Sequence, residues 1–220
     1  MGLRTSAVDE RAADYLFYPE SSLALRPGER NYVAHGEANG VHKAYKCRVR
    51  EPWYMVPDVR VPDLILSVFS ERPVLSNNDG RFVASNSLLC GFLRSGTAED
   101  FAASWYTSLT LLGCESEVHA LGGGVMVLVP REAGNIRIAN PHRHPPKHLG
   151  SLAECLADGD IRGAYERGDE AILRGCMGLS NQAIDRIRQG VAILAHWRTS
   201  ARGGVQASAP DDSEVGRDAP

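Results

Sequence analysis

The 220-residue sequence lacks the features of membrane-spanning, secreted and disulfide-bonded proteins. It has no run of about 18 apolar residues, so we expect no membrane-spanning helix. Its first residues lack the apolar segment of a signal peptide. The five cysteines are an odd number without a close pair, which argues against a disulfide framework and against a Cys-x-x-Cys zinc site. These absences favour a reduced, cytoplasmic compartment.

Motifs of several enzyme classes are also missing. The sequence contains neither Gly-x-Ser-x-Gly nor His-Glu-x-x-His, so no catalytic residue is predicted. The triple glycine at 122–124 lacks the Lys-Ser/Thr of a phosphate loop, which favours a turn over nucleotide binding. His142, His144 and His148 follow one another in a proline-rich stretch without a partner at ligand spacing. We expect a solvated loop there and no metal site.

Positive charge is scarce overall but concentrated in one place. The formal net charge is -3, and residues 1–150 carry 16 Lys/Arg against 16 Asp/Glu. Residues 41–60 carry five cations against only Glu51 and Asp58. The net charge argues against a chain that binds nucleic acid over its whole surface, whereas this local excess favours one basic site.

The stretch "YKCRVREPWYMVP" (45–57) contains most of that excess. Read as a strand, it places Lys46, Arg48 and Arg50 on one face, with successive cations roughly 6.6 to 6.8 Å apart. Such a row is either a solvated strand face or a site for a polyanion. Lys43 precedes it and the rings of Trp53 and Tyr54 follow it, and this combination of cations and aromatic rings is typical of nucleic-acid surfaces.

The pattern of apolar residues predicts an α+β fold, in which a mixed sheet packs against one long helix at about 98–118. An apolar run at 63–69 and the run after the glycines at 122–130 read as strands. "NNDG" (77–80) predicts the turn of a hairpin. Thr97 is the expected cap of the long helix.

The end of the chain is predicted to be helical, at roughly 150–157, 160–175 and 181–198, with Ser180 as a cap. Residues 169–194 could form a helix-turn-helix that offers Asn181, Gln182, Arg186 and Arg188 to a groove, but plain helix packing is favoured. The predicted division is a linker or strand at 1–29, a DNA-binding domain at 30–141, a linker at 142–149, a helical subdomain at 150–198 and a disordered tail at 199–220.

Three blocks in order carry a family resemblance: "YVAHGEANGVHKAYKCRVREPWYMVPDVRVPDLIL", "ASNSLLCGFL" and "SWYTSLTLLGCESEVHALGGGVMVLVPREAGNIRIANP". Together they resemble the carboxyl-terminal, target-recognition region of N6-adenine-specific DNA methyltransferases of restriction-modification systems. The resemblance covers about residues 30–141 and continues more weakly over 150–198. The family's Gly-Arg-x-Tyr pattern before the glycines is absent here, where residues 118–121 read Val-His-Ala-Leu.

This resemblance implies the part of a DNA methyltransferase that recognises the DNA target but does not itself transfer the methyl group. The Asn-Pro-Pro-Tyr/Phe loop for a flipped adenine and the glycine-rich site for S-adenosylmethionine do not occur in the sequence. We therefore expect double-stranded DNA as a partner, and the cofactor on a methyltransferase catalytic domain or subunit in trans. The implied DNA contacts are Lys43, Lys46, Arg48, Arg50, Trp53, Tyr54, Asn86 and Ser87. The alternative is a protein-interaction module that docks a partner subunit.

Overall fold

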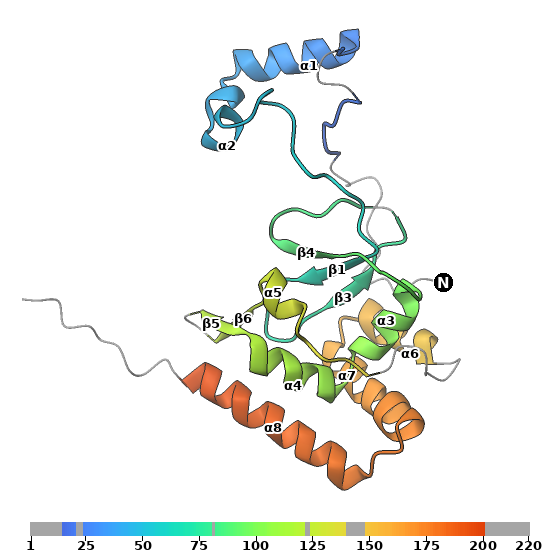
Figure 1. Cartoon of the computed structure of the whole chain (residues 1–220). Coiled ribbons are helices and arrows are strands. Elements are labelled where there is room, and N and C mark those ends of the chain that lie inside the picture. The colour runs from blue at the N-terminus through green and yellow to red at the C-terminus, as the bar shows by residue number, and fades with distance from the viewer. Residues whose placement is uncertain (1–14, 21–23, 81, 122–123, 140–147, 201–220) are drawn as a thin grey trace, which may run out of the picture.

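The computed structural model describes residues 15–20, 24–80, 82–121, 124–139 and 148–200 and confirms the α+β class. Figure 1 shows α1 and α2 set apart from a larger body of two small sheets and the remaining helices. The elements are α1 (Pro27–Ala38), η2 (Val41–Lys43), α2 (Tyr45–Arg48), β1 (Leu64–Ser67), β2 (Phe69–Ser70), β3 (Leu75–Asn77), β4 (Leu88–Gly91), α3 (Ala98–Trp105), α4 (Ser108–Glu117), β5 (His119–Leu121), β6 (Val125–Val127), α5 (Pro130–Ala133), α6 (His148–Ala157), α7 (Ile161–Gly168), the π-helix η3 (Asp169–Cys176) and α8 (Asn181–Ser200).

Two antiparallel sheets stand in place of the single mixed sheet that was predicted. The first has the order β3-β1-β4, with Ile65 opposite Ser76 on one side and Cys90 on the other. The second has the order β2-β6-β5, with Phe69 opposite Val127. The predicted strands at 63–69 and after the glycines are therefore confirmed.

The hairpin predicted around "NNDG" is wrong, although the turn itself is present. Asp79 and Gly80 adopt φ of 49° and 69°, as such a turn requires. However, β3 and β4 both pair with β1, which lies between them. The buried Asn78 amide donates hydrogen bonds to the carbonyls of Pro62 (2.7 Å) and Phe82 (2.8 Å), and so it fastens the loop to the chain before β1.

The long helix predicted at 98–118 is divided into α3 and α4. Thr97 caps α3 as predicted, since its hydroxyl accepts from the Asp100 amide (3.1 Å). Tyr106 leaves the helical region at φ -80°, ψ 65°, and Thr107 caps α4. The break brings the Tyr106 carbonyl against Gly168 of α7, where a side chain would overlap the carbonyl oxygen. Tertiary packing thus overrides a continuous helical pattern.

One core joins the sheets to the helices at the end of the chain. Leu66 and Leu75 of the first sheet, Met126 of the second and Leu152 of α6 belong to the same cluster of buried side chains. Tyr106 ties the centre together, because its hydroxyl donates to the Leu75 carbonyl (2.6 Å) and accepts from the Leu75 amide (3.1 Å). The predicted division into domains stays a prediction.

The three helical segments predicted after residue 150 are confirmed by α6, α7 with η3, and α8. Ser180 caps α8, as its hydroxyl accepts from the Ala183 amide (3.2 Å). Figure 1 shows α8 lying along α4, and a β-carbon on Gly190 would lie 3.2 Å from Leu112. Residues 142–147 and 201–220, with His142, His144 and most of the predicted tail, lie outside the described residues. The solvated loop predicted for His148 is wrong, because His148 is buried at the start of α6 with its Nε2 3.1 Å from the Ala103 carbonyl oxygen. None of the described helices has the length and apolar character needed to cross a membrane.

We predict that Gly168→Ala destabilises the fold, because its methyl group would overlap the Tyr106 carbonyl. The free energy of unfolding should fall by about 1–3 kcal/mol, the usual cost of overpacking. Urea unfolding followed by circular dichroism measures it. Gly150→Ala in α6 is the matched control, since its β-carbon would have no neighbour within 4 Å. Equal stability of the two variants would contradict the close approach.

Candidate nucleic-acid interface

The cations at 43–50 lie on two short helical turns and not on a strand. Gly40 adopts a left-handed φ of 74° that starts η2, and the amides of Cys47 and Arg48 donate to the Ala44 carbonyl at 3.0 and 2.9 Å. The predicted strand with alternating faces is therefore wrong, because local helical hydrogen bonds occupy the backbone that a sheet would need.

Lys43, Lys46 and Arg48 are nevertheless exposed to solvent. Among the described residues, none of the three forms an ion pair with a carboxylate. The Arg48 guanidinium lies 5.9 Å from the centre of the exposed Tyr45 ring. These cations are available to an anionic partner, and they sit on η2 and α2 in the part of the molecule that is set apart from the core (Figure 1).

Trp53 faces inward and packs on α1. A β-carbon on Gly36 would lie 2.7 Å from the indole, so glycine makes room for the ring. The indole N–H donates to Glu37 Oε1 (3.1 Å), and the ring lies 6.2 Å from that of His42. Trp53 therefore links η2 to α1.

Tyr54 joins the same ring cluster on its other side. It lies 5.8 Å from Trp53 and 6.3 Å from Phe17, and Phe17 in turn contacts Tyr32 of α1 at 4.8 Å. We call α1, η2, α2 and these rings (residues 15–20 and 24–56) the amino-terminal unit. Trp53 and Tyr54 are half-buried in this ring cluster, and the predicted contact of the two rings with DNA stays a prediction.

Arg50 differs from the other three cations. It is half-buried and lines an apolar cavity of about 440 Å³ between α1 and the segment around Trp53. Its guanidinium is therefore partly withdrawn from solvent, and it is a weaker candidate for a phosphate contact than Lys46 or Arg48.

Asn86 and Ser87 lie elsewhere, in an exposed turn that leads into β4. The structure describes no hydrogen bond from either side chain to the amino-terminal unit. The family resemblance grouped them with the cations, whereas the fold places them in the turn before β4.

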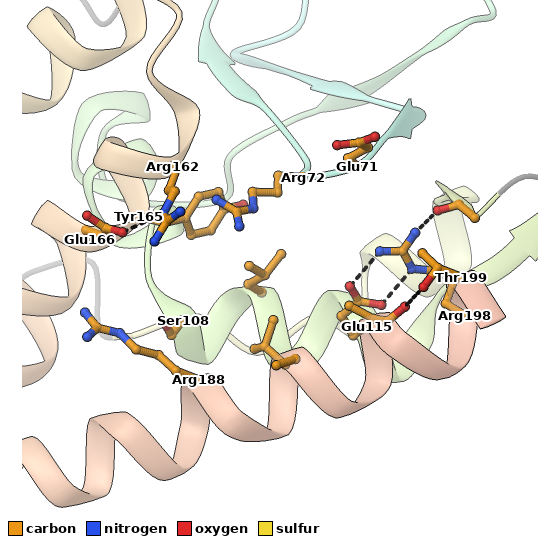
Figure 2. Close-up of a pocket in the computed structure, with 15 residues that line it drawn as sticks. Glu71, Arg72, Ser108, Glu115, Arg162, Tyr165, Glu166, Arg188, Arg198 and Thr199 are labelled. Carbon is orange, nitrogen blue, oxygen red and sulfur yellow. Dashed lines mark hydrogen bonds and ion pairs between the residues drawn. The ribbon is translucent and has the colours of Figure 1, made fainter.

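A second polar site lies on the far side of the body, where α4, α7, α8 and the turn between β2 and β3 meet. Figure 2 shows this cleft, whose volume is about 620 Å³. We call it the arginine cleft after its four guanidinium groups, those of Arg72, Arg162, Arg188 and Arg198. Sequence reasoning missed it, since its residues come from separate segments between residues 71 and 199 and follow no common periodicity.

Two of these arginines hold α8 in place. Arg188 donates to Asp169 (2.9 Å), a fully buried carboxylate that also accepts from the amide (2.6 Å) and hydroxyl (2.5 Å) of Ser108. Arg198 makes a two-pronged ion pair with Glu115, with both distances 2.9 Å, and donates to the Gly124 carbonyl. The buried carboxylates thus have full sets of donors, and α8 closes one wall of the cleft. Because Arg188 is engaged in this way, the helix-turn-helix reading loses one of its four side chains.

The buried Cys114 thiol and the buried Tyr106 hydroxyl both have raised pKa values. Burial raises the pKa of the Cys114 thiol to about 12, with Glu115 adding to the shift. Burial also raises the pKa of the Tyr106 hydroxyl, and the hydrogen bond with the Leu75 backbone offsets part of this rise. Neither group has the properties of a nucleophile at neutral pH. Within the described ranges no three His, Cys, Asp or Glu side chains gather to hold a metal ion.

Comparison with models of protein families shows to which family the chain belongs. The model of the "Type II methyltransferase M.Eco57I, C-terminal domain" matches residues 4–173, more than half of the chain. The chain belongs to this family. No curated protein and no solved structure matches it. The match supports the family reading of the sequence, and in the structure it ends within η3, so that α8 lies beyond it.

We predict that Asp169→Ala lowers the free energy of unfolding by about 2–4 kcal/mol, because the Ser108 amide and hydroxyl lose their acceptor in a buried site. Asp185→Ala is the control, since Asp185 is exposed and lies 3.8 Å from the same Arg188. Its effect should stay within about 0.5 kcal/mol. Thermal and urea unfolding measure both variants. Equal losses for Asp169→Ala and Asp185→Ala would contradict a larger contribution from the buried carboxylate.

Proposed function

We propose that this chain is the DNA target-recognition part of an adenine-specific methyltransferase of a restriction-modification system, and that it is non-catalytic by itself. Family membership supports a place in a Type II methyltransferase. The observation that carries the DNA contact is the exposure of Lys43, Lys46 and Arg48 on η2 and α2, without carboxylate partners among the described residues. Cations presented in this way contact phosphates and set the register of a protein on duplex DNA.

The rest of the reaction is assigned to a partner. The sequence has no Asn-Pro-Pro-Tyr/Phe loop for an extruded adenine. S-adenosylmethionine and the methyl transfer therefore belong to a catalytic domain or subunit in trans. The chain would supply the orientation of the DNA, and its activity would be visible only when that catalytic partner is present.

We predict that Lys46→Ala combined with Arg48→Ala weakens binding to a short DNA duplex and flattens its salt dependence. Each lost phosphate contact should reduce the slope of log K against log salt by roughly 0.9, so the double variant should lose about 1.8. Fluorescence anisotropy across a salt series measures this slope.

The matched control is Arg174→Ala combined with Arg186→Ala, which removes the same charge from the helical end of the chain. Its slope should equal that of the original protein. A slope that falls for the control and not for Lys46/Arg48 would place the DNA on the helical end and contradict the proposal.

A second candidate function is docking of a partner subunit through the amino-terminal unit. The apolar cavity of about 440 Å³ and the exposed side chains of Tyr45 and Val49 favour it. A salt titration distinguishes DNA binding from docking of a partner subunit. The affinity of an apolar protein contact changes little with salt concentration, whereas the affinity for duplex DNA falls steeply.

A further inference from the structure

The turn between β2 and β3 carries one of the four arginines that line the arginine cleft. Arg72 is exposed on this turn. The next residue, Pro73, is buried, and its carbonyl accepts from Trp105 Nε1 (3.3 Å) and from the Tyr165 hydroxyl (2.9 Å). Two buried side chains thus fasten the backbone beside Arg72, which limits the entropy lost when its guanidinium binds a ligand.

Among the described residues no acidic side chain lies within ion-pair distance of Arg72. Its neighbour Glu71 also lines the cleft and acts electrostatically on Arg198. The charge of Arg72 does reach Tyr165, where it opposes the rise in pKa that burial causes. The guanidinium therefore lies beside the ring that forms the floor of this end of the cleft.

Arg162 approaches the same place from α7. Figure 2 shows the guanidinium groups of Arg72 and Arg162 close to Tyr165. Within the part of the chain that the structure describes, Arg162 is paired only with Glu166 of its own helix, at 2.8 Å, and both side chains are more than half exposed. Exposed pairs of this spacing contribute little, so Arg162 can turn to a stronger acceptor at small cost.

At this end of the cleft Arg72 forms no ion pair with a described residue. Glu166 pairs with Arg162, Glu71 acts on Arg198, and the buried Asp169 is already occupied by Ser108 and Arg188. The remaining donors are planar forks, which match the oxygens of a phosphate group better than those of a neutral ligand.

We propose that Arg72 and Arg162 form a phosphate-binding site at this end of the arginine cleft, and that its ligand is a backbone phosphate of duplex DNA. The proposal rests on the proposed function for the identity of the DNA. It adds a contact on the body of the protein, far along the chain from Lys46 and Arg48, so that one duplex would be held at two separate places.

The test compares Arg72→Ala combined with Arg162→Ala against Arg174→Ala, whose side chain is likewise exposed and paired with a carboxylate four residues away, but lies outside the cleft. We expect the double variant to bind a DNA duplex on the order of tenfold more weakly and with a slope of log K against log salt lower by roughly 0.9 to 1.8. Arg174→Ala should match the original protein. Circular dichroism checks that all variants keep the fold.

If the original chain binds duplex DNA and the cleft variant keeps its affinity and slope, the cleft site is overturned while the proposed function stands. If the original chain binds no duplex, the proposed function fails, and pyrophosphate then decides about the site. An increase in melting temperature with millimolar pyrophosphate, lost in the cleft variant only, supports a site for a free phosphate compound. No increase overturns the site as well.

Discussion

The fold depends on one close contact between two backbone segments, the Tyr106 carbonyl and Gly168. Because no side chain fits at this point, α7 approaches the break between α3 and α4 directly. The contact has support on both sides. The Tyr106 hydroxyl binds the backbone of Leu75 in the first sheet, and Asp169 accepts from both groups of Ser108 at the start of α4. Sheet, central helices and terminal helices are thus joined around a few fully hydrogen-bonded buried groups, which is what keeps burial of polar atoms favourable.

In the amino-terminal unit, too, a glycine allows a close contact. Its two large rings, Trp53 and Tyr54, are used to hold η2 and α2 against α1, and the small Gly36 makes the contact possible. The cations on those short helical turns are then the groups left facing solvent. The stretch "YKCRVREPWYMVP" thus contains, within thirteen residues, both the rings that pack inside the unit and the cations that face solvent.

The sequence predicts structure correctly where residues close in sequence form the interaction. Thr97 and Ser180 cap their helices, and Asp79–Gly80 form a turn. The errors arose where distant residues decide. A continuous helical pattern is broken at Tyr106 by a glycine sixty-two positions later, and the alternation at 45–50 was compatible with both a strand and a helical turn because no partner strand can be read from the sequence. The arginine cleft carries no local signal at all.

The central claim is that duplex DNA meets the exposed cations of η2 and α2. Hydrogen–deuterium exchange of the whole chain, with and without duplex, tests it most directly, because short helices open readily and report a ligand as slowed exchange. Slower exchange at residues 41–50 in the presence of DNA, with the core of α3 unchanged, is the predicted result. Bound DNA that leaves 41–50 exchanging at the rate of the free chain would contradict the account.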